Sequence, residues 1–193
     1  VAGRPGRSLT LLDAYGGVGL FSGSLLDGVP GWRAVVAERS RSSVADARHN
    51  LTDIDAKVVA TTDYNELLGD MDMIVTSTSG AGKKILDITK VKPGCVITDV
   101  ARPLDLPPSE VAKRPDVLVI ESGEILLPGD VQMKNIGLPK NVAYACLAET
   151  IVLALEGRFE SFTVGRAIEW GKVREIYQLG LKHGMRLAAI SGA

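Results

Sequence analysis

A glycine cluster between two apolar runs constrains this chain more than any other feature. The order is an apolar run from Leu9 that stops at Asp13, the glycines, a helical stretch over Val18–Leu26, and a second apolar run, Ala34–Ala37, that ends in Glu38. The glycines are Gly16, Gly17 and Gly19. Strand, glycine-rich turn, helix, strand and acid, in this order, indicate the first half of a nucleotide-cofactor fold.

The residue three positions before Gly16 favours one cofactor over another. A dinucleotide site has glycine where its first strand ends, but Asp13 stands there, and a carboxylate repels a pyrophosphate by about 1 kcal/mol at contact in water. S-adenosylmethionine has no phosphate, and its ammonium attracts a carboxylate. Glu38 follows Gly19 by 19 residues, close to the roughly 20 expected of a ribose-binding acid. The pattern therefore favours S-adenosylmethionine over NAD, the alternative being a tight turn that binds nothing.

The remainder of the chain alternates apolar runs with helical stretches. Continuous apolar strands are typical of a parallel sheet covered on both faces, and right-handed crossovers predict a doubly wound, Rossmann-like α/β sheet of order 3-2-1-4-5-6. Ser40 is a plausible N-cap for a helix that runs to about Leu51, and Asp63 for a short helix over Tyr64–Leu68. Two C-terminal helices are expected, over residues 140–156 and 169–183. The later strands are expected at Lys57–Thr61, Asp72–Thr76, Gly94–Asp99 and Asp116–Glu121.

Small polar residues follow the fourth expected strand. Thr76, Ser77 and Thr78 begin a turn that continues to Gly82. The carboxyl edge of an open α/β sheet is where ligands bind, so these hydroxyls and N–H groups are candidates to hold a ribose or an anion. A plain connection built of small residues is the equal alternative.

Composition limits the classes of protein. The chain has 193 residues, 46% of them hydrophobic, and a net charge of −1, which fits one domain over 1–193 and gives no electrostatic case for nucleic acid or an anionic membrane. The sequence shows neither a signal peptide nor an apolar run of 18 residues, so a cytoplasmic location is expected. Cys95 and Cys146 lack zinc-ligand spacing, and no metal is expected. The apolar helix at 140–156 is compatible with a homodimer.

The chain resembles two families, each over one part. Residues 1–52, with the motif DAYGGVGLFS and the following VVAERSRSSVADARHNL, are similar to the cofactor segment of bacterial RNA uracil C5 methyltransferases. Residues 57–193 resemble the NADP-binding domain of the long-chain acyl-ACP reductase and predicted amino-acid dehydrogenase family. The motifs of this second resemblance are DMIVTSTSG, CVITDVARP, LVIESGEILLPG, NVAYACLAETIVLALEG and FTVGR.

The first resemblance implies that Asp13 and the glycines hold the methionine part of S-adenosylmethionine and that Glu38 holds its ribose. The second implies that Cys146 accepts an acyl group and that Arg39 faces the 2′-phosphate of NADP, next to Glu38. The split indicates an engineered chimera joined between about Asn50 and Lys57, a divergent natural reductase being the competing account.

Each resemblance also lacks something that its family needs. The methyltransferases carry a catalytic cysteine after the fourth strand, where this chain reads STSGAGKK, and the reductases carry a large segment before the nucleotide domain, where this sequence has eight residues. We therefore expect a cofactor-binding scaffold without turnover, with S-adenosylmethionine as its ligand. The alternative is an NADP(H)-dependent oxidoreductase that forms an aldehyde from an acyl thioester through Cys146.

Overall fold

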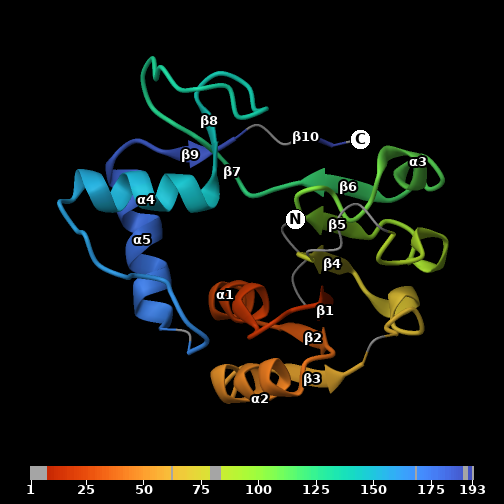
Figure 1. Ribbon diagram of the computed structural model, residues 1–193. Coiled ribbons are helices and arrows are strands. Elements are labelled where there is room, and N and C mark those ends of the chain that lie inside the picture. Colours follow the sequence, from red (N-terminus) through yellow and green to blue (C-terminus); the bar gives the residue numbers. More distant parts are fainter. Residues whose placement is uncertain (1–7, 62, 79–83, 168, 189–190, 193) are drawn as a thin grey trace. The chain divides into compact units, whose positions relative to one another are not determined.

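The computed structural model describes residues 8–61, 63–78, 84–167, 169–188 and 191–192 (Figure 1). The chain divides into two compact units. Unit 1 comprises residues 1–122 with the short segments 166–168 and 191–193, and unit 2 comprises 123–165 and 169–190. The junction expected between Asn50 and Lys57 lies inside unit 1. The prediction of a single domain over 1–193 stays a prediction.

Unit 1 is built on a seven-stranded sheet of order β10-β6-β5-β4-β1-β2-β3. Strands β1 to β6 are parallel and lie in the order 3-2-1-4-5-6, which confirms the predicted doubly wound Rossmann-like fold. The seventh, β10, pairs antiparallel with β6 and was not expected. The strands are β1 (Leu9–Ala14), β2 (Trp32–Glu38), β3 (Ala56–Ala60), β4 (Met73–Thr76), β5 (Val96–Asp99), β6 (Leu118–Glu121) and β10 (Ser191–Gly192).

Two helices of unit 1 follow the first two strands. Helix α1 (Leu20–Gly28) begins two residues later than Val18 because Gly19 has a φ of 86°, outside helical geometry. Helix α2 (Arg41–Asn50) begins where expected, and the hydroxyl of Ser40 accepts a hydrogen bond from the N–H of Ser43 at 3.4 Å.

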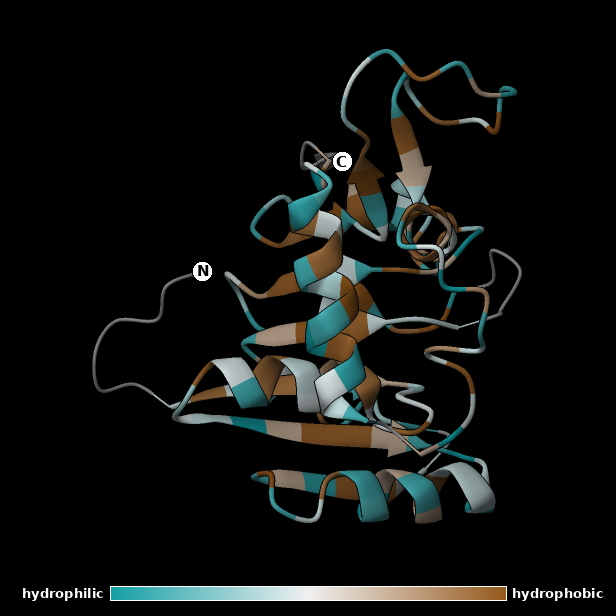
Figure 2. Ribbon diagram, turned by 90° about the vertical axis from the view of Figure 1, so that its left-hand side faces the viewer, coloured by the Kyte–Doolittle hydropathy of each residue, from teal (hydrophilic) through white to brown (hydrophobic). Residues whose placement is uncertain are grey.

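The two faces of the sheet bury separate apolar clusters. One contains Leu12, Ile74 and Ile97, fully buried with side chains from the connections that follow β3, β4 and β5. The other contains Leu11, Ala34 and Val75, with side chains of α1 packed on them. The strands are accordingly coloured largely as hydrophobic in Figure 2. The continuous apolar strands of the sequence are explained by this burial on both faces.

The prediction of a short helix over Tyr64–Leu68 is wrong. The carboxylate of Asp63 accepts the N–H of Asn65 at 3.0 Å and its side-chain amide at 2.8 Å, which fixes a turn in place of a helical cap. A 3₁₀ turn, η1 (Leu68–Asp70), follows. Two further short elements were not predicted, η2 (Ile88–Lys90) and α3 (Pro108–Val111).

Unit 2 combines a small antiparallel sheet with two helices. Its strands, none of them predicted, are β7 (Glu124–Leu126), β8 (Val142–Tyr144) and β9 (Arg186–Leu187), in the order β8-β7-β9. Helix α4 (Ala145–Leu155) starts five residues later than the predicted 140, because Val142–Tyr144 pair with β7. Helix α5 (Trp170–Lys182) agrees with the prediction to within one residue at each end. No helix in the described parts of the chain is both long and apolar enough to cross a bilayer.

Candidate functional site

The carboxyl group of Asp13 lies fully buried at the end of β1. Its Oδ2 accepts hydrogen bonds from the N–H of Ser22, at 3.2 Å, and from the hydroxyl of the same residue, at 2.8 Å. Its Oδ1 is buried and has no hydrogen-bond partner among the described residues. Burial raises the pKa of Asp13 to about 6, with the two Ser22 hydrogen bonds acting in the opposite direction and the nearby Glu38 adding a smaller increase.

At two positions of the turn only glycine fits, because neighbouring side chains leave no room for a Cβ atom. A Cβ on Gly16 would lie 2.6 Å from a methyl carbon of Val36 and 2.8 Å from the carboxyl carbon of Asp13. A Cβ on Gly19 would lie 2.7 Å from a methyl carbon of Leu51. Gly17 differs from both, because its Cβ would meet nothing, and only its φ of 56° favours glycine. The turn is therefore packed tightly onto β1, β2 and α2.

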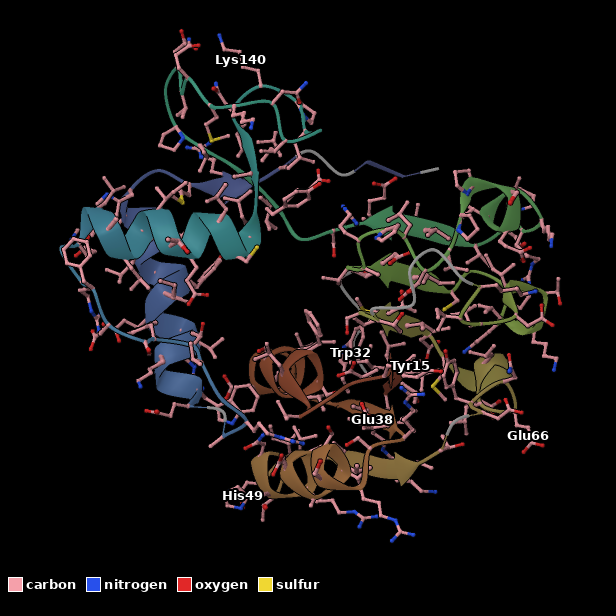
Figure 3. All side chains as sticks on the ribbon, in the orientation of Figure 1. Tyr15, Trp32, Glu38, His49, Glu66 and Lys140 are labelled. Atoms are coloured by element: carbon pink, nitrogen blue, oxygen red, sulfur yellow. The ribbon has the colours of Figure 1, made fainter. Side chains whose placement is uncertain are left out.

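Glu38, at the end of β2, is held by three backbone N–H groups. Its Oε1 accepts from Arg39 at 2.7 Å and from Ser40 at 2.8 Å, and its Oε2 accepts from Gly17 at 3.1 Å. The carboxylate thereby joins the glycine turn to the start of α2. Figure 3 shows Glu38 at the same edge of the sheet as Tyr15. A carboxylate has about four acceptor positions, so within the described structure Oε2 keeps one for a ligand. Arg39, next to it, is exposed.

The residues after β4 are only partly described. Thr76 is fully buried, and its hydroxyl has no hydrogen-bond partner in the described structure. Thr78 donates its N–H and its hydroxyl to the buried carboxylate of Asp105, at 3.0 and 2.5 Å. Ser77, between them, is half-buried. The rest of the predicted turn, from residue 79 to Gly82, lies outside the described residues.

Three residues of this region were not identified from the sequence. Asp105, which holds Thr78, lies in the β5–β6 connection, where no motif marks it. Ser22, the partner of Asp13, looks like an ordinary helix residue. Tyr15 has a φ of 58°, unusual for a bulky residue, and its ring contacts that of Tyr64 edge-on at 5.5 Å between centroids.

A clasp between α2 and residue 166 also escaped sequence analysis. The amide of Asn50 donates to the carbonyls of Val18, at 3.0 Å, and of Arg166, at 2.9 Å. The guanidinium of Arg166 in turn bonds the hydroxyls of Ser42 and Ser43 and forms an ion pair with Asp46. The clasp ties the glycine turn to a segment that is distant in sequence.

Cys146 belongs to unit 2. It is the second residue of α4, and it is exposed. Cys95 is buried, and burial raises the pKa of its thiol to about 12. The described residues contain no group of three or more His, Cys, Asp or Glu side chains suited to a metal ion.

The carboxyl ends of β1, β2 and β4 therefore bring together every predicted cofactor residue that the structure describes. The N–H groups of Gly17 and Ser22 already donate to carboxylates of the protein, and that of Gly19 donates to the carbonyl of Gly16 at 2.8 Å. Such a turn has few donors for a phosphate. It presents acceptors, which suit hydroxyl and ammonium groups.

Comparisons with known proteins give partial likenesses. No protein-family model matches the chain. It is 36% identical over 132 residues to the aminotransferase PigE of Serratia sp. (strain ATCC 39006), which is 67% of this chain and 15% of that protein. The chain thus spans less than a sixth of that relative's length.

Solved structures with a similar sheet include methyltransferases and a reductase domain. Precorrin-6y C5,15-methyltransferase of Geobacter metallireducens GS-15 is 20% identical, with a TM-score of 0.42 over 55% of this chain and 59% of that one. The nucleotide-binding domain of glutamyl-tRNA reductase from Thermoplasma volcanium is 19% identical, with a TM-score of 0.41 over 57% and 74%. The tRNA (uracil-54, C5)-methyltransferase of Pyrococcus abyssi is 16% identical, with a TM-score of 0.36 over 60% and 25%. These likenesses concern the fold alone.

Proposed function

We propose that unit 1 binds S-adenosylmethionine and does not turn it over. The observation that carries the proposal is the pair of hydrogen bonds from Ser22 to Asp13, at 3.2 and 2.8 Å. A dinucleotide places its pyrophosphate at the N-terminus of the first helix. Here a carboxylate of the protein occupies donors of that helix turn, so a pyrophosphate would meet negative charge and fewer N–H groups.

The electrostatics of the turn support a cationic ligand. Asp13 and Glu38 face the same turn closely enough for the charge of Glu38 to raise the pKa of Asp13. S-adenosylmethionine carries a sulfonium and an ammonium group against one carboxylate, and its net positive charge complements this pair. The remaining acceptor position on Oε2 of Glu38 is available to a ribose hydroxyl.

Different residues would contact different parts of the ligand. Gly16, Gly17 and Gly19 allow close approach of the ligand to the backbone, and Glu38 accepts from the ribose. Thr76, Ser77 and Thr78 form the neighbouring edge, with Thr78 oriented by Asp105. We infer no chemical step, since the described part of unit 1 brings no cysteine or histidine to this edge of the sheet.

We also propose that the chain is a chimera of a methyltransferase-like and a reductase-like part. The split resemblance supports this, and the α2–β3 connection at residues 51–55 is a surface turn where two Rossmann-like parts can join. In such a chimera the contacts of Arg166 with α2 would be new, because they link the two parts.

Calorimetric titration and thermal unfolding with S-adenosylmethionine, NADPH and NAD test the binding proposal. A ligand at 100 times its dissociation constant adds about 2.7 kcal/mol to the free energy of unfolding. We expect a shift with S-adenosylmethionine alone. The variant Glu38→Gln should weaken its binding by about five- to 150-fold, since removing a buried hydrogen-bond partner costs about 1–3 kcal/mol. Glu66→Gln, at an exposed position of unit 1, is the matched control.

A second candidate function rests on the exposure of Cys146. An accessible thiol can accept an acyl group from a thioester, and hydride from NADPH would then release an aldehyde. Thermal stabilisation by NADPH but not by S-adenosylmethionine would favour this oxidoreductase over the first proposal. Absence of a shift with all three ligands would reject both.

A further inference from the structure

Unit 2 contains a long loop whose two ends are joined by a single side chain. The loop covers residues 127–141, between β7 and β8. The side-chain amide of Asn141 donates to the carbonyl of Gly129 at 2.7 Å, and its oxygen accepts the N–H of Val131 at 3.0 Å. The N–H of Leu127 donates to the carbonyl of Asn141 at 2.7 Å. Long compact loops with joined ends are frequently functional.

Asn141 holds this arrangement in an uncommon backbone conformation. Its φ is 63°, in the left-handed region, which asparagine tolerates better than other non-glycine residues. Local strain of this kind persists where the surrounding structure fixes it, and it is concentrated at functional sites. The three hydrogen bonds of Asn141 supply that fixation.

The loop forms a cavity of about 300 Å³ that is open to solvent and is lined by residues 131–136 and 138–142, at the lower end of the range of ligand pockets. Apolar side chains contribute part of the lining, with Val142 buried and Val131 and Leu138 half-buried. Lys134 and Lys140 also line it (Figure 3 labels Lys140), and residues 131–142 include no Asp or Glu.

The positive charges of the two lysines favour an anionic ligand in the cavity. Lys140 forms an ion pair with Asp130 at 2.6 Å, in which both side chains are about two-thirds exposed. Exposed pairs of this type are weak and can give way to a competing anion. Lys134 is exposed and forms no ion pair within the described structure. A cationic rim over apolar side chains is suited to an anion that carries a short hydrocarbon chain.

We propose that the loop 127–141 is a binding site for a small amphiphilic anion, a carboxylate or phosphate monoester on a short aliphatic chain. The head group would contact Lys134 and Lys140, and the chain would contact Val131, Leu138 and Val142. Asn141 acts as a positioning residue that keeps the loop closed. The site lies within unit 2 and does not depend on the function proposed for unit 1.

Titrations of the full chain with hexanoate and hexyl phosphate, followed by NMR and calorimetry, test the proposal. Saturable binding is expected, with amide shifts concentrated in residues 131–142. Acetate, which lacks the chain, and hexanol, which lacks the charge, should bind more weakly. Comparison of the two anions distinguishes a carboxylate from a phosphate head group.

Variants separate this site from non-specific binding. Lys134→Gln should weaken hexanoate binding by about two- to fivefold, the upper part of the range for one exposed charge contact. Lys57→Gln, which removes an exposed lysine of unit 1, should leave it unchanged. Asn141→Gly keeps the backbone conformation accessible, removes the amide, and should weaken binding without unfolding the protein. Absence of saturable binding, or equal losses in both lysine variants, would overturn the proposal.

Discussion

The carboxylate of Asp13, at the end of β1, is hydrogen-bonded to Ser22, in the first turn of α1. One oxygen accepts from both the N–H and the hydroxyl of Ser22, and the other has no partner in the described structure. The link fixes the start of α1 and uses one N–H group of its first turn. It also leaves an ionisable group fully buried, with consequences for stability.

The stability contribution of Asp13 depends on pH. Because burial raises its pKa from 3.8 to about 6, the folded protein holds a proton that the unfolded chain has released between these values. The contribution is therefore fully present below pH 3.8 and is lost as pH rises to about 6. A shift of about two units corresponds to about 3 kcal/mol. The free energy of unfolding from urea titrations should show this loss in the wild type relative to Asp13→Asn, whose amide does not titrate. Parallel pH profiles for the two proteins would contradict it.

Gly16 should tolerate no side chain. In Gly16→Ala the new Cβ would lie 2.6 Å from Val36 and 2.8 Å from Asp13. Overpacking of this kind costs about 1–3 kcal/mol or more, and we expect the loss in the free energy of unfolding measured with urea. Gly28→Ala, in the last position of α1 with open space around it, is the control and should be neutral or stabilising by up to about 1 kcal/mol. Equal stability of the two variants would show that the turn can expand.

The central part of unit 1 was predictable because its signals are local. The parallel strands are mostly apolar runs, which predict a sheet covered on both faces, and 3-2-1-4-5-6 is a common order for such a sheet with right-handed crossovers. Asp13, Gly16 and Glu38 were singled out for the spacing that a cofactor turn has, and the structure brings them together at the carboxyl ends of β1 and β2, while their role stays a prediction. The predicted N-cap at Ser40 was correct for the same reason, since capping depends on a residue three positions away.

What escaped prediction depends on contacts between residues far apart in the sequence. Val142–Tyr144 continue the apolar pattern of α4, yet they pair with β7, some 18 residues earlier. Tyr64–Leu68 have helical spacing, but the side chain of Asp63 competes locally for the backbone. Asp105 and Arg166 acquire their roles through partners 27 and over 120 residues away, which no short pattern reveals.

The clasp at Asn50 should contribute measurably to the stability of unit 1. Its amide donates to two backbone carbonyls, at 3.0 and 2.9 Å. Asn50→Ala removes both hydrogen bonds, each worth about 0.5–1.5 kcal/mol, so a loss of about 1–3 kcal/mol is expected in chemical denaturation. His49→Ala, at the exposed neighbouring position, should change stability by less than about 0.5 kcal/mol. A loss no larger than that of the control would mean that the segment at Arg166 is not fixed to α2.

The two cysteines should differ sharply in reactivity. Cys146 is exposed near the start of α4, whereas Cys95 is buried beside β5 with its pKa raised to about 12. The thiolate is the reactive form, so burial protects Cys95 twice, by blocking access and by keeping the thiol protonated. A disulfide reagent such as DTNB should therefore titrate one thiol per chain in the native protein and two in denaturant. Cys146→Ser should abolish the native reaction, and Cys95→Ser should leave it intact. Rapid labelling of both thiols without denaturant would show that the sheet around β5 opens readily.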